Sequence, residues 1–149
     1  MPKYVVDTNL YVRATRSAEA NGALEAFYAS CAPFVYLHSV VAGELLAGAA
    51  SPDVERMTQV RFIAPFEGRG RVITPSHAAW RRAGLIVAAL VRHKRLSPNG
   101  IARSFLNDCL LAAGAREHGY TLVTENERDF ALIRTVAPIE TVPPFPDRD

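Results

Sequence analysis

The chain has 149 residues, of which 49% are hydrophobic and 21% charged, so it is long enough for one domain with a real core and too short for two. Its formal net charge of +2 is too small to indicate nucleic-acid binding by itself. No apolar run reaches membrane-spanning length, and we expect no signal peptide because the N-terminus begins with a strand-like segment. Cys31 and Cys109 lie in apolar stretches without metal-ligand spacing, which predicts buried reduced thiols and a cytoplasmic protein.

The first part of the chain predicts two strands, each followed by a helix. Residues 3–6 are continuous and β-prone, which predicts a short buried strand. Apolar residues recur at helical spacing over 17–30, so we expect an amphipathic helix there. Residues 34–37 predict a second strand, and Ser39 is expected to cap the next helix, over 40–46.

The middle of the chain continues the alternation. Ser-Pro-Asp at 51–53 is typical of a helix start, and this helix is expected to reach Ile63 and stop before Pro65. Residues 70–74 predict a third strand, and Pro75-Ser76 introduces a long helix over 77–93. Its buried side is expected to carry Trp80, Leu85, Ile86, Ala89 and Leu90.

The last part predicts a loop, a helix, a strand, a short helix and a final strand, at 96–100, 107–117, 121–124, 127–133 and 139–142. Gly119 suits the C-terminal cap of the first of these helices. Alternating strands and helices predict an α/β domain over 1–142, with a mainly parallel sheet flanked by helices on both faces, followed by a Pro-rich tail at 143–149.

Four acidic residues are expected at one edge of this sheet, because parallel strands end, and their helices begin, on the same side. Asp7 ends the first strand, and Glu44 lies about one turn into the helix after the second. Asp108 is expected in the first turn of its helix, and Asp129 follows the fourth strand. Taken singly, Asp108 is explained as a helix N-terminal acid and Asp129 as a capping or surface residue. Such separate explanations do not account for two acids, Glu44 and Asp108, both lying in apolar stretches.

Several carboxylates in one place repel one another unless a cation is present. Oxygen donors favour Mg²⁺ or Mn²⁺ over zinc, and such an ion can activate water and stabilise a phosphodiester as charge builds on it. A basic surface beside an acidic pocket would suit an enzyme that cuts a polyanion, although a run of charges is more often a solvated helix face. The basic cluster comprises Arg81, Arg82, Arg92, His93, Lys94 and Arg95.

Three blocks in order resemble the PIN-domain family: VVDTN at 5–9, SVVAGELLAG at 39–48 and NDCLLAAGAREHGYTLVTENERDF at 107–130. More narrowly, they are similar to VapC-type toxins of bacterial toxin–antitoxin pairs, including the FitB-like branch. The resemblance implies a PIN-like three-layer α/β/α fold. It also implies a Mg²⁺- or Mn²⁺-dependent ribonuclease, usually a homodimer, silenced by a small antitoxin that also binds operator DNA.

The resemblance also implies which residues form the site. The acids of the family fall on Asp7, Glu44 and Asp108, as metal ligands and catalytic residues. Thr8 and Asn9 match the polar residues after the first acid, which are implied to orient it by hydrogen bonds.

The late T-x-N-x-x-D-F pattern falls on Thr124, Asn126, Asp129 and Phe130. Many relatives carry an acid at the position of Asn126, so two residues compete for the fourth ligand position. Either Asp129 or the amide oxygen of Asn126, acting through water, could take that position.

Two other classes compete with the nuclease. A phosphoryl-transfer domain would use Asp7 as a nucleophile, but one such family expects a second aspartate where this chain has Asn9, and another expects a lysine near 124–126, where none is present. A non-catalytic module would bind only RNA or a protein. The nuclease ranks first.

A partner protein is expected at the same place. Without metal, a concentrated acidic pocket should attract an arginine or lysine side chain, which fits an antitoxin that occludes the cleft and alone brings the complex to operator DNA. The apolar face around the second predicted helix is expected to be partly core and partly available to that partner or to a second copy of the chain. Its residues are Val40, Val41, Leu45 and Leu46.

Overall fold

Five short parallel strands form one sheet in the order β3-β2-β1-β4-β5. The structure is a computed structural model in which residues 3–145 are described. Parallel strands covered on both faces are expected to be continuously apolar, and β4 is buried along its whole length. The strands are β1 (Lys3–Val6), β2 (Val35–His38), β3 (Val72–Ile73), β4 (Tyr120–Val123) and β5 (Thr141–Val142).

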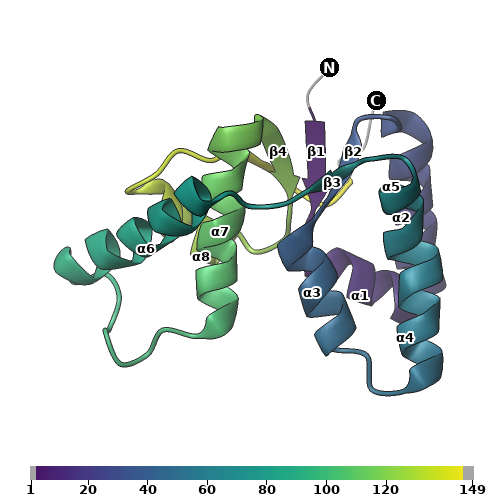
Figure 1. The fold of residues 1–149 in the computed structure, drawn as a ribbon, viewed down its shortest axis with the longest axis horizontal. Helices are drawn as coiled ribbons and strands as arrows, with labels where there is room; N and C mark the ends of the chain where they lie inside the picture. The colour runs from purple at the N-terminus through teal and green to yellow at the C-terminus, as the bar shows by residue number, and fades with distance from the viewer. Residues whose placement is uncertain (1–2, 146–149) are drawn as a thin grey trace.

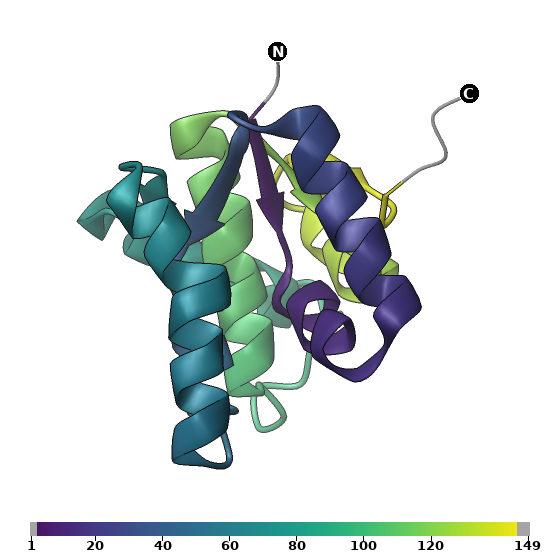
Figure 2. The same ribbon diagram turned by 90° about the vertical axis from the view of Figure 1, so that its right-hand side faces the viewer.

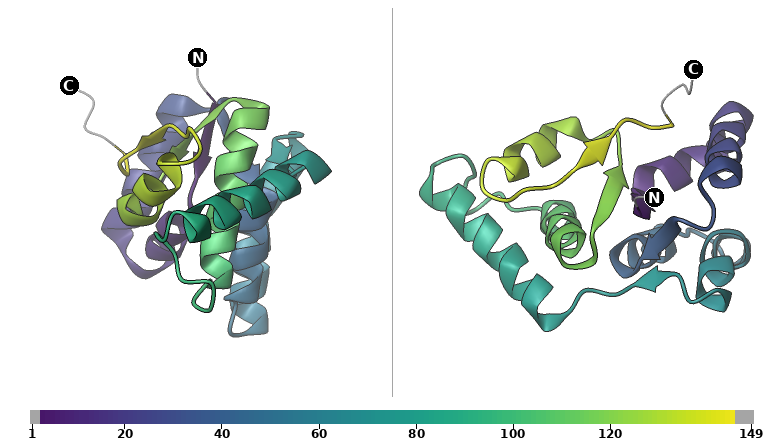
Figure 3. Two further views of the ribbon diagram at one scale, coloured as in Figure 1. Left: turned by 90° about the vertical axis from the view of Figure 1, so that its left-hand side faces the viewer. Right: turned by 90° about the horizontal axis from the view of Figure 1, so that it is seen from above.

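Helices cover both faces of this sheet, as Figure 1 and Figure 3 show. The connections that lead from β1 to β2 and on to β3 place α1 to α5 on one side, while those that lead to β4 and β5 place α6, α7 and α8 on the other. Their bounds are α1 Thr8–Arg16, α2 Ala18–Cys31, α3 Ser39–Ala47, α4 Pro52–Thr58, the π-helical η1 Gln59–Ile63, α5 Ala64–Gly68, α6 His77–Arg92, α7 Arg103–His118 and α8 Glu127–Arg134. The predicted three-layer α/β/α architecture is confirmed.

The strand order reverses between β1 and β4, which are paired from Lys3↔Tyr120 to Val6↔Val123. The chain leaves these two strands toward opposite faces, so a crevice opens beyond their carboxyl ends, where open α/β sheets bind ligands. Asp7 lies at this point, because it joins β1 to α1 and its N–H donates to the carbonyl of Val123 at 2.9 Å. Figure 2 shows β1 pointing toward α1 at this edge.

Helix α7 forms the centre of the layer opposite α1 and α2, and it is buried from Asp108 through Ala115. A Cβ atom on Gly114 would lie 2.7 Å from the Tyr120 hydroxyl and 3.1 Å from His38 Nε2, so this helix approaches β2 and β4 closely only because position 114 is glycine. Gly119, at φ +67°, ends the helix in the left-handed conformation, as predicted.

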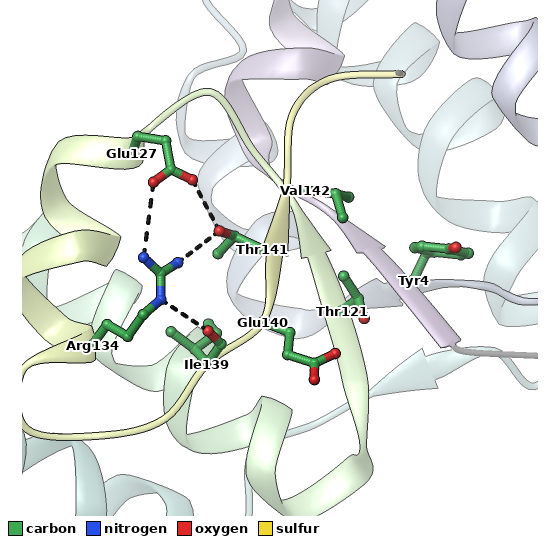
Figure 4. Close-up of a pocket in the computed structure, with 8 residues that line it drawn as sticks. All are labelled: Tyr4, Thr121, Glu127, Arg134, Ile139, Glu140, Thr141 and Val142. Atoms are coloured by element: carbon green, nitrogen blue, oxygen red, sulfur yellow. Dashed lines mark hydrogen bonds and ion pairs between the residues drawn. The ribbon is translucent and has the colours of Figure 1, made fainter. Parts of the chain in front are cut away.

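The edge strand β5 is attached to α8 through Arg134 (Figure 4). The Arg134 guanidinium donates to the Ile139 carbonyl at 3.2 Å and to the Thr141 hydroxyl at 2.7 Å, and that hydroxyl donates to Glu127 at 3.0 Å. These contacts surround a hollow of about 520 Å³ beside Tyr4, which shares no lining residue with the acidic edge of the sheet. The contacts hold the last strand to the sheet.

The predicted strands and helices are found with shifted ends, and α1 was not predicted at all. The helix after position 51 does not stop before Pro65: the chain widens into η1, and Pro65 then lies in the first turn of α5. Ser39 is the first helical residue of α3 rather than its cap, because His38 Nδ1 accepts the N–H of Val40 at 3.1 Å.

Two further predictions about burial and position are wrong. Trp80 and Leu85 are 52% and 61% exposed, because α6 packs through Ala79, Ala83 and the other apolar residues on their stripe. Helix α7 begins at Arg103, so Asp108 lies in its second turn rather than its first. Cys31 and Cys109 are buried thiols, as expected. Among residues 3–145, no helix combines the length and apolarity needed to cross a bilayer.

The domain boundary at residue 142 remains a prediction. Of the Pro-rich tail at 143–149, Phe145 packs against Phe27 with ring centroids 5.2 Å apart. The part of the tail from 146 to 149 lies outside the described residues.

Candidate active site

Asp7 is 6% exposed, and its two carboxylate oxygens have separate partners. Oδ1 accepts the N–H of Thr8 at 2.8 Å, which caps α1, and Oδ2 accepts the Thr124 hydroxyl at 2.7 Å. Burial raises the pKa of Asp7, and these two hydrogen bonds offset part of that rise. The bond to Thr124 spans the crevice between β1 and β4.

Glu44 reaches the same edge from the second turn of α3 and is half-buried. Its Oε1 accepts the Thr8 hydroxyl at 2.9 Å, so Thr8 binds Asp7 through its backbone and Glu44 through its side chain. Burial raises the pKa of Glu44, hydrogen bonds from Thr8 and Asn107 lower it, and the negative charge of Asp7 raises it further. Helices α1, α3 and α7 therefore meet at this carboxylate.

Asp108 projects from α7 and is 9% exposed. Burial, together with the negative charges of Asp7, Asp129 and Glu44, raises the pKa of Asp108 to about 8. A hydrogen bond from Asn126 offsets only part of this rise. Burial is the largest cause of the rise in the pKa of Asp108, and the three neighbouring acids add to it.

Asn126 lies between the last two acids. Its amide nitrogen donates to Asp108 at 3.2 Å and to Asp129 at 3.1 Å, while its amide oxygen accepts the N–H of Asp129 and caps α8. The backbone N–H of Asn126 donates to the Thr124 hydroxyl at 3.0 Å. In this orientation the nitrogen, not the oxygen, faces the carboxylates.

The structure joins most of the predicted site residues into one network. Among the residues predicted to bind or orient the metal, Asn9 is the exception: it is exposed, and within residues 3–145 its side chain makes no hydrogen bond. The connected residues are Asp7, Thr8, Glu44, Asp108, Thr124, Asn126 and Asp129.

The donor set fits a hard divalent cation, because it consists of carboxylate oxygens with no thiolate or imidazole among them. The ion pairs of the described residues involve other acids, so none of them neutralises these four carboxylates. As the side chains lie, no three acidic, His or Cys side chains among the described residues already form a closed ligand set.

The hollow beside two of the basic residues predicted to contact RNA has none of the carboxylates in its lining. Arg81 and Arg82 line a separate hollow of about 350 Å³ together with Arg116 and the turn after α8. The others, Arg92, Lys94 and Arg95, lie exposed at and beyond the end of α6. Their contact with RNA stays a prediction.

A cavity that the sequence analysis missed adjoins Glu44. It has a volume of about 610 Å³, and its lining includes Trp80 from α6 and Arg103 from α7. The signal was present in the sequence: Ala79, Ala83, Ile86 and Leu90 form a continuous helical stripe, which leaves Trp80 off the buried side.

Comparison with known proteins agrees with this fold. The family model described as "PIN domain" matches residues 4–135. No curated protein matches the sequence.

Three solved structures illustrate the similarity in fold. DNA-bound VapBC from Salmonella typhimurium has 23% identity and a TM-score of 0.70, over 96% of this chain and 98% of that one. FitAcB from Neisseria gonorrhoeae has 18% identity and a TM-score of 0.67, over 95% and 98%. A toxin–antitoxin complex from Klebsiella pneumoniae has 26% identity and a TM-score of 0.60, over 87% and 91%.

Proposed function

Because the chain belongs to the PIN domain family, we propose that it is a divalent-metal-dependent endoribonuclease and the toxin of a toxin–antitoxin pair. The observation that carries the proposal is the acidic network at the switch point of the sheet, where burial and three neighbouring acids raise the pKa of Asp108 to about 8 without a paired cation. A bound cation would relieve this repulsion and favour the ionised carboxylate, which supports a metal site here.

Asp7, Glu44 and Asp108 would hold Mg²⁺ or Mn²⁺, with Asp129 beside them as a further carboxylate. When bound, such an ion activates water and stabilises the charge that develops on a phosphodiester. The polar residues of the chain set the positions of the carboxylates: Thr8 holds Asp7 and Glu44 relative to each other, and Asn126 does the same for Asp108 and Asp129.

The partners follow from the same site. The solved structures of similar fold include complexes of toxins with antitoxins, some of them bound to DNA, which supports a cognate antitoxin for this chain. Its inhibitory segment would place an arginine or lysine among the carboxylates, and operator DNA would be bound only through that complex. We propose that the protein cleaves RNA in the cytoplasm and that it is a homodimer.

The test is RNA cleavage by the purified full-length protein with Mn²⁺, with Mg²⁺ and with chelator. We expect metal-dependent cleavage that Asp7→Asn removes and Asp53→Asn leaves unchanged, because Asp53 is an exposed acid on α4 outside the network. Cleavage that persists in chelator, or that survives in Asp7→Asn, would rule out the proposed site. No cleavage by the wild type with either ion would favour the non-catalytic alternative.

A further inference from the structure

We propose that the cavity beside Glu44, lined by Trp80 and Arg103, binds an unpaired base of the RNA together with its phosphate. This inference rests on the proposed function, because it assigns the part of the substrate that lies next to the scissile position. The cavity has a volume of about 610 Å³ and lies between α3, α6 and α7.

Trp80 supplies the surface on which a base can stack. It is 52% exposed, and within residues 3–145 it makes no aromatic or cation–π contact. The helix is held by the neighbouring Ala79, which is 2% exposed, so the indole is not needed to attach α6 to the core. Aromatic rings presented in this way bind single-stranded bases by stacking.

The cavity is continuous with the acidic network. Glu44 lines it and belongs to the carboxylate set, and Asn107 lines it and hydrogen bonds to Glu44. A nucleotide in the cavity therefore has its neighbouring phosphodiester beside the carboxylates. The hollow lined by Arg81 and Arg82 has no such connection, because none of the carboxylates lines it.

Most of the lining is apolar, including Val40, Leu106 and Leu110, which suits the faces of a base, while polar side chains in the same lining suit the phosphate and the ribose. Arg103 is exposed and forms no ion pair within residues 3–145, so its guanidinium is available to a phosphate. The hydroxyls of Ser39 and Thr74 lie 3.0 Å apart in the lining and can exchange their mutual bond for one to a base edge or a ribose. An aromatic ring, a cation and hydroxyl groups are what proteins use to bind single-stranded RNA.

The kinetic test compares Trp80→Ala, Trp80→Phe and Val60→Ala on a single-stranded oligoribonucleotide of mixed sequence. Trp80→Ala should raise KM about tenfold or more, and Trp80→Phe should keep KM close to the wild-type value because a ring is retained. Val60 is the control: it is 67% exposed and lines neither this cavity nor the hollow beside Arg81 and Arg82, so Val60→Ala should keep the wild-type KM. Arg103→Gln should flatten the dependence of KM on salt.

The binding test uses the fact that Trp80 is the only tryptophan of the chain. In the Asp108→Asn variant, which should not cleave, single-stranded RNA should quench the fluorescence of Trp80, and the same sequence as a duplex should quench it far less. Unchanged fluorescence with single-stranded RNA would overturn the inference. So would a Trp80→Ala variant that dissociates a dimer in sedimentation while keeping the wild-type KM, because the cavity would then be an interface between copies.

The two proposals fail separately. If the wild type cleaves RNA and Trp80→Ala cleaves it with the same KM and base preference, the base site is wrong and the nuclease stands. If the wild type cleaves no RNA with either metal but single-stranded RNA still quenches Trp80, the base site stands and the catalytic proposal is wrong.

Discussion

Replacing Asp108 with asparagine should make the metal-free protein more stable while it removes the response to metal. Burial and the acids around it raise the pKa of Asp108 from 3.8 to about 8, so between these values the folded chain binds a proton that the unfolded chain has lost. Asp108 therefore does not lower the free energy of unfolding below pH 3.8, and it lowers this free energy increasingly as pH rises toward 8. Asparagine is neutral throughout and still offers an oxygen to the amide of Asn126.

The size of the effect follows from the same interval. At about 1.4 kcal/mol per pH unit, the span from 3.8 to pH 7 gives an upper limit of about 4 kcal/mol for the gain in free energy of unfolding at pH 7. For a domain of this size, each 1 kcal/mol raises Tm by roughly 2–4 °C. The gain should shrink steadily as pH is lowered toward 4.

The measurement is thermal and urea unfolding of both proteins from pH 4 to 8, first in chelator and then in Mn²⁺. Wild type should gain about 2.7 kcal/mol at a metal concentration of 100 Kd, and Asp108→Asn should gain little. A variant that is less stable than wild type in chelator at pH 7, or an advantage that does not change with pH, would refute the electrostatic argument.

Three other changes test the surroundings of the site. Burial and His118 lower the pKa of His38 to about 4, so wild-type stability should fall relative to that of His38→Asn as pH drops from 6.5 toward 4, measured by urea unfolding. Gly114→Ala should destabilise the protein by roughly 1–3 kcal/mol in the same assay, since its Cβ would lie 2.7 Å from the hydroxyl of Tyr120. Asn126→Asp replaces a donor to two acids with another carboxylate, so it should lower Tm in chelator and enlarge the rise in Tm caused by Mn²⁺.

The parallel sheet and its acidic edge could be predicted because they depend on local patterns. Continuous β-prone runs give strands buried on both faces, and the chain direction then places Asp7, Glu44 and Asp108 on one side. Helix α1 could not be found in this way, since its sequence TNLYVRATR is rich in weak helix formers and becomes helical where Leu10 and Tyr11 pack into the core.

The remaining errors also have physical causes. The start of α7 was placed too late because its cap position is Ala102, whose side chain makes no capping bond and gives no sequence signal. Trp80 is predicted on the buried side of its helix together with Leu85, but both are exposed. Helix α6 instead packs on α7 through small residues such as Ala79 and Ala83, and this close packing leaves the large ring outside.

Asp7 can serve both as the cap of α1 and as the proposed metal ligand. A carboxylate offers about two acceptor positions on each oxygen, and the hydrogen bonds from Thr8 and Thr124 use one on each. These two bonds come from opposite sides of the crevice, so they set the plane of the carboxylate, and the positions left over remain available to a cation. The cap would therefore orient the proposed metal ligand, and an Asp7→Asn protein should keep α1 while losing the charge that the cation needs.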